Sequence, residues 1–156
     1  MKIEKGQLAP AFVLHDTEKK EISLADQKGK NVLLVFFPLA FTSVCTKELC
    51  SLRDNIATYN NADAVVFGIS VDSPQTLAKF KEEQGLNFSL LSDFNKEASA
   101  SFGSLYDSFG GWMKGVSKRS AFIVDKQGVI QYAEVLENAG ELPNFEAIQG
   151  ILKNLK

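Results

Sequence analysis

The chain has 156 residues, of which 45% are hydrophobic and 23% charged, the balance of a protein that folds around an apolar core. Its formal net charge of −2 leaves no cationic surplus, so neither nucleic acid nor an anionic membrane is an expected partner. The N-terminus shows no apolar secretory segment, and the apolar run 32–41 is too short to cross a bilayer. We therefore expect one domain over residues 1–156 and a cytoplasmic location.

The first half of the chain alternates between strand and helix patterns. Short strands are expected at 12–14 and 21–24, on either side of a polar turn, as an N-terminal β-hairpin. Segments 31–37 and 64–71 are continuously apolar, as strands buried on both faces are. Between them, apolar residues recur every three or four positions over 43–59, which predicts an amphipathic helix.

The second half contains one more helix, a short strand and a hairpin. Ser73 and Pro74 open a helix that Gly85 closes, and a strand at 88–91 and a weaker helix around 96–102 follow. Segment 104–118, which includes Trp112, has no pattern that assigns it. A turn at 125–128 joins strands 120–124 and 129–135, and an apolar stripe at 145–155 indicates a final helix. This order predicts a mixed sheet with helices on both faces, the thioredoxin-like class of α/β folds.

The segment 36–50, FFPLAFTSVCTKELC, places Cys45 in the first turn of a helix that follows a buried strand. Backbone N–H groups there have no intrahelical partner and the helix dipole is positive, so a thiolate is stabilised. Thr42 can cap this helix and reach the thiolate, and Pro38 ends the strand beside it. The alternatives are a buried packing cysteine, a plain cap and a plain strand end.

Residues 38–45, PLAFTSVC, match the peroxiredoxin active-site pattern of a proline, three residues, a threonine or serine, two residues and the reactive cysteine. The segments APAFVLHD, SVD at 70–72, LLSD at 90–93 and RSAFIVDKQGVI at 119–130 resemble the same family in order. The motif looks most like the AhpE-like branch, whereas the C-x4-C spacing is typical of the PrxQ, or bacterioferritin comigratory protein, branch. The resemblance implies a thioredoxin-like antioxidant enzyme that reduces hydroperoxides with a thiol and needs no cofactor.

The resemblance also implies a role for each motif residue. Cys45 would be the peroxidatic cysteine, which a hydroperoxide oxidises to a sulfenic acid. Thr42 would hydrogen-bond the peroxide, and Pro38 would shield the thiolate from water. Arg119 would stabilise both the thiolate and the developing oxyanion, as a fixed cation beside the sulfur does.

Without the family, the charged residues have other interpretations. Arg119 would be a solvated charge at the end of a strand, and Lys118 would be an equal candidate for an active-site cation. Glu48, one turn after the cysteine, either orients the arginine or faces solvent as an ordinary helix residue.

Cys50 would be the resolving cysteine of an intramolecular disulfide, with thioredoxin or a similar thiol as the electron donor. In an intact helix, Cα atoms five residues apart lie about 8–9 Å from each other, beyond the usual disulfide limit of about 7 Å. The pairing with Cys45 therefore predicts that the first turns of the helix unwind on oxidation. If Cys50 is only structural, an external thiol must resolve Cys45.

Other functions are less well supported by the residues. A thioredoxin-type reductase would need C-x-x-C, which is absent, and two cysteines with His15 do not supply a four-ligand metal set. A non-catalytic redox sensor or chaperone could use the same Cys45, and repeated peroxide turnover would separate the two. The preferred peroxide, the choice between monomer and homodimer, and the role of Trp112 stay open.

Overall fold

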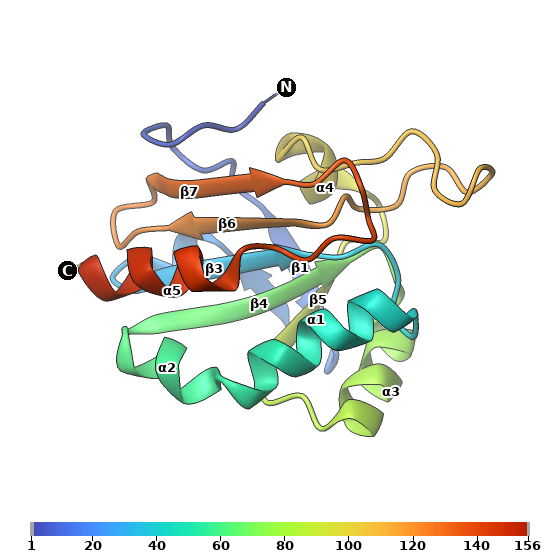
Figure 1. The fold of residues 1–156 in the computed structure, drawn as a ribbon, viewed down its shortest axis with the longest axis horizontal. Helices are drawn as coiled ribbons and strands as arrows, with labels where there is room; N and C mark the ends of the chain where they lie inside the picture. Colours follow the sequence, from blue (N-terminus) through green and yellow to red (C-terminus); the bar gives the residue numbers. More distant parts are fainter. Residues whose placement is uncertain (1, 156) are drawn as a thin grey trace.

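A seven-stranded mixed β-sheet forms the centre of the computed structural model, which describes residues 2–155 (Figure 1). Its strands are β1 (Val13–Asp16), β2 (Glu21–Ser23), β3 (Asn31–Phe36), β4 (Ala64–Ser70), β5 (Ser89–Ser92), β6 (Ser120–Val124) and β7 (Ile130–Val135). They lie in the order β2-β1-β5-β4-β3-β6-β7. The β3–β4 and β4–β5 pairs are parallel and the other pairs antiparallel, which confirms the predicted mixed sheet and the N-terminal hairpin.

Helices cover both faces of this sheet, as the order of elements predicted. They are the 3₁₀ turn η1 (Ala25–Gln27), α1 (Ser43–Asp54), α2 (Ile56–Asn61), α3 (Pro74–Gln84), α4 (Glu97–Ser101) and α5 (Phe145–Asn154). Side chains of α1, α2, α3 and α5 enter one apolar cluster, while α4 and the N-terminal segment contribute to the cluster on the opposite face. No helix within residues 2–155 is long and apolar enough to span a membrane.

Strand β3 is apolar at nearly every position because both of its faces are buried. All six of its residues are buried. Leu33 and Val35 belong to the cluster beneath α1 and α5, whereas Leu34 and Phe36 belong to the cluster on the other face. Each fully buried side chain of this size contributes about 1.5–3 kcal/mol to folding, so the strand is a rigid base for the loop that follows it.

The helix predicted over 43–59 is wrong in one respect, because the structure divides it into α1 and α2 at Asn55. The backbone of Asn55 leaves the helical region, with φ −114° and ψ 16°. Its side-chain amide donates a hydrogen bond to the carbonyl of Ser51. An asparagine side chain can hydrogen-bond to nearby backbone groups in this way and so interrupt a helix. The apolar spacing continues across the break, so periodicity alone did not reveal the break.

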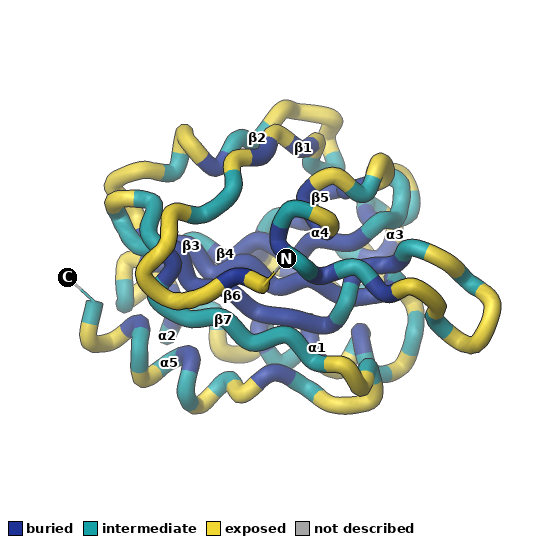
Figure 2. Tube along the Cα trace, turned by 90° about the horizontal axis from the view of Figure 1, so that it is seen from above, coloured by how far each residue is buried: buried dark blue, intermediate teal, exposed yellow. Residues whose placement is uncertain are grey.

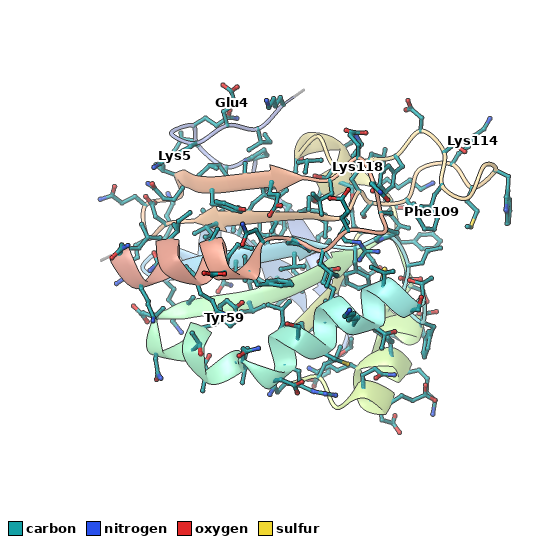
Figure 3. The ribbon with its side chains drawn as sticks, in the orientation of Figure 1. Glu4, Lys5, Tyr59, Phe109, Lys114 and Lys118 are labelled. Carbon is teal, nitrogen blue, oxygen red and sulfur yellow. The ribbon has the colours of Figure 1, made fainter. Side chains whose placement is uncertain are left out.

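Residues 104–118, which the sequence left unassigned, form an excursion that projects from the body of the protein between α4 and β6 (Figure 1). Two isolated bridges, Leu105 with Ser117 and Phe109 with Met113, hold its two arms together. Figure 2 shows its outer part as exposed chain, and Figure 3 shows Lys114 farther out than Phe109. Trp112 is 75% exposed, so it does not line the core.

Two glycine substitutions test the packing of the sheet against its helices. A Cβ atom on Gly68 of β4 would lie 2.7 Å from Leu90 Cδ2, whereas one on Gly150 of α5 meets nothing within 4 Å. We expect Gly68→Ala to lower the free energy of unfolding by about 1–3 kcal/mol through overpacking. Gly150→Ala should raise it by up to about 1 kcal/mol, because alanine is the better helix former. Urea unfolding measures both, and equal effects would contradict this packing.

Candidate active site

The turn from β3 into α1 carries the motif of residues 38–45. Pro38 is buried just beyond the end of β3, and Thr42 occupies the N-cap position of α1 with an extended backbone, φ −87° and ψ 151°. Cys45 therefore lies in the first helical turn, as the sequence predicted, and its residue is 0% exposed. A thiolate at this position faces the free N–H groups of the turn and the positive end of the helix dipole.

This turn contains a strained residue. Phe41 has φ 69°, in the left-handed region that is unusual for a bulky residue. Its ring packs against that of Phe80 on α3, with centroids 5.1 Å apart. Strain of this kind costs about 1–3 kcal/mol and persists only where the surroundings hold it. The backbone just before Thr42 is therefore fixed by tertiary contacts rather than by its local preference.

Asp72, at the end of β4, supplies the polar part of that restraint. Its Oδ2 accepts hydrogen bonds from the Ala40 backbone N–H at 2.8 Å and from the Ser70 hydroxyl at 2.6 Å. The Asp72 carbonyl in turn accepts a hydrogen bond from the hydroxyl of Ser92 on β5. The motif loop is thus tied to the carboxyl ends of two parallel strands.

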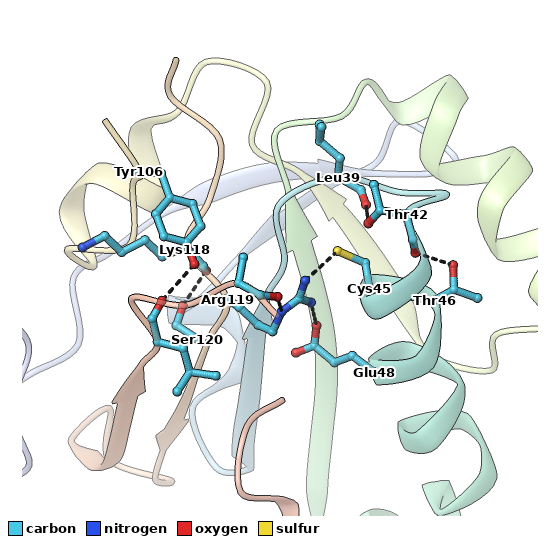
Figure 4. Close-up of polar contacts among 11 residues, drawn as sticks. Leu39, Thr42, Cys45, Thr46, Glu48, Tyr106, Lys118, Arg119 and Ser120 are labelled. Carbon is cyan, nitrogen blue, oxygen red and sulfur yellow. Dashed lines mark hydrogen bonds and ion pairs between the residues drawn. The ribbon is translucent and has the colours of Figure 1, made fainter. Parts of the chain in front are cut away.

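A buried charge cluster lies at the start of α1 (Figure 4). Arg119 Nη2 is 3.2 Å from Cys45 Sγ, and Arg119 Nη1 is 2.7 Å from Glu48 Oε1. The side chains of Arg119 and Glu48 are 2% and 0% exposed. The guanidinium therefore binds a sulfur and a carboxylate from successive turns of one helix, in an interior where such interactions are strong.

The electrostatics of the cluster follow from its burial. Desolvation raises the pKa of Glu48 from 4.5 to about 8, although Arg119 opposes it, and the charge of Glu134 adds to the increase. Burial works against the charge of Arg119, but Glu48 and Cys45 outweigh it and raise its pKa above the ordinary value. Glu48 is thus protonated far more readily than an exposed glutamate.

Backbone groups fix the guanidinium from the other side. Arg119 Nε donates a hydrogen bond to the carbonyl of Ala139 at 2.8 Å, and the N–H of Leu136 donates to the Arg119 carbonyl. The Tyr106 hydroxyl donates to the Leu136 carbonyl at 2.9 Å. The segment between β7 and α5 therefore holds Arg119 in the orientation that reaches Cys45.

The structure brings together most, but not all, of the predicted residues. Glu48 points inward to Arg119 and does not face solvent, and Lys118 pairs with Glu137 at 2.7 Å instead of joining the cluster. Thr42 occupies the cap position, but the prediction that its side chain caps the helix is wrong, because its hydroxyl oxygen accepts no hydrogen bond from a backbone N–H of α1. The hydroxyl instead donates to the Leu39 carbonyl at 2.9 Å.

Cys50 lies outside the cluster, farther along α1. It is half-buried and free, and its Sγ is 3.5 Å from Gln84 Oε1 at the end of α3. Arg53 donates a hydrogen bond to the Gln84 carbonyl, so this end of α1 is fastened to α3 at two points. A disulfide with Cys45 would break the first of these contacts.

Sequence reasoning missed the supporting residues Asp72 and Ala139. Asp72 occurs in the segment SVD, which carried only a family resemblance, and a strand-end aspartate was the available signal. A backbone carbonyl such as that of Ala139 has no sequence signal. His15 is exposed on β1, and residues 2–155 contain no cluster of three or more His, Cys, Asp or Glu side chains suited to a metal.

Comparison with known proteins gives consistent matches. The AhpC/TSA family matches residues 5–133, a range that includes Cys45, Cys50 and Arg119. Alkyl hydroperoxide reductase E of Mycobacterium tuberculosis is 40% identical over 138 residues, 88% of each chain. Peroxiredoxin Bcp of Escherichia coli is 37% identical over 131 residues, 83% of this chain and 84% of that protein. The crystal structure of peroxidoxin BcpB from Mycobacterium tuberculosis has a TM-score of 0.87 at 27% identity and covers 99% of both chains.

The contact between Asp72 and the motif loop can be tested by substitution. Asp72→Ala leaves the Ala40 N–H without its acceptor, so we expect the free energy of unfolding to fall by about 1–3 kcal/mol. Hydrogen exchange at the Ala40 amide should accelerate, whereas Asp72→Asn, which keeps an acceptor oxygen, should change it less. Asp107→Ala, at an exposed carboxylate, is the control. Unchanged exchange at Ala40 in Asp72→Ala would contradict the restraint.

Proposed function

Because the chain belongs to the AhpC/TSA family and is a peroxiredoxin, we propose that Cys45 is the residue that reduces the peroxide. Its thiolate attacks the distal oxygen of a hydroperoxide, an S–O bond forms, and the O–O bond breaks. The leaving alkoxide or hydroxide takes a proton and departs as alcohol or water, and Cys45 becomes a sulfenic acid. Hydrogen peroxide and organic hydroperoxides are the proposed substrates, the second because one relative is named alkyl hydroperoxide reductase E.

The observation that carries this proposal is the contact of Arg119 Nη2 with Cys45 Sγ at 3.2 Å. A fixed guanidinium favours the thiolate before attack and can bind the developing oxyanion during attack. The sulfur also lies at the positive end of α1, so two independent sources of positive potential act on the same atom.

Thr42 and Pro38 support the reaction in different ways. The Thr42 hydroxyl donates to the Leu39 carbonyl, which leaves its lone pairs free to accept a hydrogen bond from the peroxide. Thr42 thus orients the substrate O–H group without changing its own contact. Pro38 is buried beside the motif and has no N–H to bind water, so it helps to keep the thiolate desolvated.

We propose that Cys50 resolves the sulfenic acid. Its thiolate attacks the sulfur of Cys45, an S–S bond forms and the S–O bond breaks, and the oxygen leaves as hydroxide, which takes a proton to become water. Thioredoxin or a similar dithiol of the cytoplasm then reduces the disulfide by exchange. The C-x4-C spacing, which is typical of the PrxQ branch, supports an intramolecular bond.

A one-cysteine route is the second candidate, and a specific observation favours it. Both cysteines lie in the unbroken helix α1, and Cys50 is held by Gln84 of α3. If these contacts persist after oxidation, Cys50 cannot reach Cys45, and a small thiol or a partner protein must attack the sulfenic acid instead.

Intact mass after one equivalent of hydrogen peroxide separates the routes. We expect the reduced wild type to lose two hydrogens, Cys50→Ser to gain one oxygen, and Cys45→Ser to remain unchanged over the same time. An oxygen gained by the wild type without a disulfide would support the one-cysteine route. Rapid oxidation in Cys45→Ser, or none in the wild type, would contradict the role of Cys45.

The intramolecular disulfide also predicts a loss of helix. In a helix, Cα atoms five residues apart lie about 8–9 Å from each other, so the first turns of α1 must unwind to form the bond. Far-ultraviolet circular dichroism should show less helix in the disulfide form than in the reduced protein. Cys50→Ser, oxidised in the same way, should keep its helix. An unchanged spectrum in a confirmed Cys45–Cys50 disulfide would contradict the unwinding.

A further inference from the structure

We propose that Cys45 and Glu48 share a single proton across Arg119. The positive charge of Arg119 is then balanced by the Cys45 thiolate before peroxide attack and by the Glu48 carboxylate after it. Glu48 would then act as the proton reservoir of the reaction in addition to orienting the arginine. This inference rests on the proposed function of Cys45 and extends it to the fate of the proton.

The geometry places one cation between two acids. Arg119 contacts Cys45 through Nη2 and Glu48 through Nη1, so the two acids are separated by the width of one guanidinium. All three residues are at most 2% exposed. Two ionised acids with one arginine would leave a net negative charge in the interior, and desolvating such a charge is costly. One proton held by the pair makes the cluster neutral.

The groups around the cluster do not supply a second cation. On β7, Glu134 is itself an acid, and its Oε1 accepts hydrogen bonds from the Tyr132 hydroxyl and the Asn144 N–H. In the 104–118 excursion, Tyr106 contributes a hydroxyl that is directed to a backbone carbonyl. Lys118 is paired with Glu137. Among residues 2–155, Arg119 is the one cation hydrogen-bonded to Cys45 or Glu48. The two acids therefore have a single positive charge to balance theirs.

The second oxygen of Glu48 provides the place for the proton. Oε1 is engaged by Arg119, whereas Oε2 is buried and has no hydrogen-bond partner within residues 2–155. An ionised carboxylate would leave negative charge on this unpartnered oxygen, and protonation removes it. The pKa of Glu48, raised to about 8 by burial, agrees with this assignment at neutral pH.

The reaction balances on this basis. The reactive state holds the Cys45 thiolate, protonated Glu48 and the Arg119 cation. Attack forms the S–O bond, breaks the O–O bond and releases an alkoxide or hydroxide. The proton that Glu48 loses ends on that leaving oxygen, giving alcohol or water. The product state holds the Cys45 sulfenic acid, ionised Glu48 and the same Arg119 cation, and no proton is taken from solvent.

The decisive measurement counts protons in the Cys50→Ser protein, which stops at the sulfenic acid. Stopped flow with a pH indicator in weak buffer at neutral pH follows proton uptake after one equivalent of hydrogen peroxide, and intact mass counts the oxygen gained. We expect no net uptake in Cys50→Ser. Adding Glu48→Gln, which keeps an acceptor for Arg119 but holds no exchangeable acid proton, should give uptake of one proton for each Cys45 oxidised.

Glu134→Gln in the same background is the matched control. It removes a carboxylate close to the cluster but not bonded to Arg119, so proton uptake should stay at zero. Uptake of one proton in Cys50→Ser alone would overturn the shared proton, and this result does not depend on whether the Glu48 variant folds. No uptake in the Glu48→Gln protein would overturn it as well, since the proton would then have another source.

A second readout separates proton sharing from a purely structural role of Glu48. With Glu48→Gln, Cys45 no longer shares Arg119 with a second acid, so its thiolate should form more readily and its alkylation by iodoacetamide at pH 6 should be faster. Its oxidation by peroxide should be about 100- to 10,000-fold slower, because the internal acid is missing. A loosened site would expose the buried Cys45 and speed its alkylation at pH 6 and pH 9 alike, and that result would overturn the proposal. Absence of oxygen gain in the mass of Cys50→Ser would instead show that the proposed function of Cys45 has failed.

Discussion

The contact between the Arg119 guanidinium and the sulfur of Cys45 is the interaction on which the rest of the site depends. A buried arginine is costly unless every donor it carries has a partner. Here its nitrogens are distributed among a sulfur, a carboxylate and a backbone carbonyl, from α1 and from the segment that precedes α5. Removing any of these partners would leave a buried charge underpaired, so the proposed reactivity and the local stability depend on the same contacts.

The sheet order makes that contact available. Strand β6 pairs with β3 in antiparallel register, Ser120 opposite Phe36, so the residue before β6 lies beside the start of the loop that follows β3. Arg119 therefore lies next to the first turn of α1 although it is 74 residues from Cys45 along the chain. The parallel neighbour β4 contributes Asp72 at the same end of the sheet.

Tertiary contacts restrain the loop between β3 and α1, whereas its proposed chemistry requires movement. Phe41 holds a left-handed backbone that Phe80 and the hydrogen bond from Ala40 to Asp72 stabilise. These contacts fix the position of the sulfur from which we propose that the attack occurs. Resolution by Cys50 needs the opposite, because the start of α1 must unwind and the contact with Gln84 must break. The free energy needed to unwind the start of α1 therefore adds to the activation barrier of the proposed second step.

Much of the fold was predictable from local sequence. Period and composition located the strands and most helices, because burial on two faces and burial on one stripe leave different patterns. The position of Cys45 at a helix start followed from the strand–proline–helix order, and the capping of α3 by Ser73 and Gly85 matched the expected residues. The break at Asn55 was not visible, since the apolar spacing runs across it.

The sequence by itself determined the candidate reactive segment and the family resemblance, since residues 38–45 lie together along the chain and their types suit the proposed chemistry. Only the tertiary structure decided which cation reaches the sulfur, Arg119 rather than Lys118, and that Glu48 faces inward. It also revealed Asp72 and the Ala139 carbonyl as supports. The physical reason is that these contacts depend on strand register and side-chain burial, which join residues far apart in sequence and leave no local pattern.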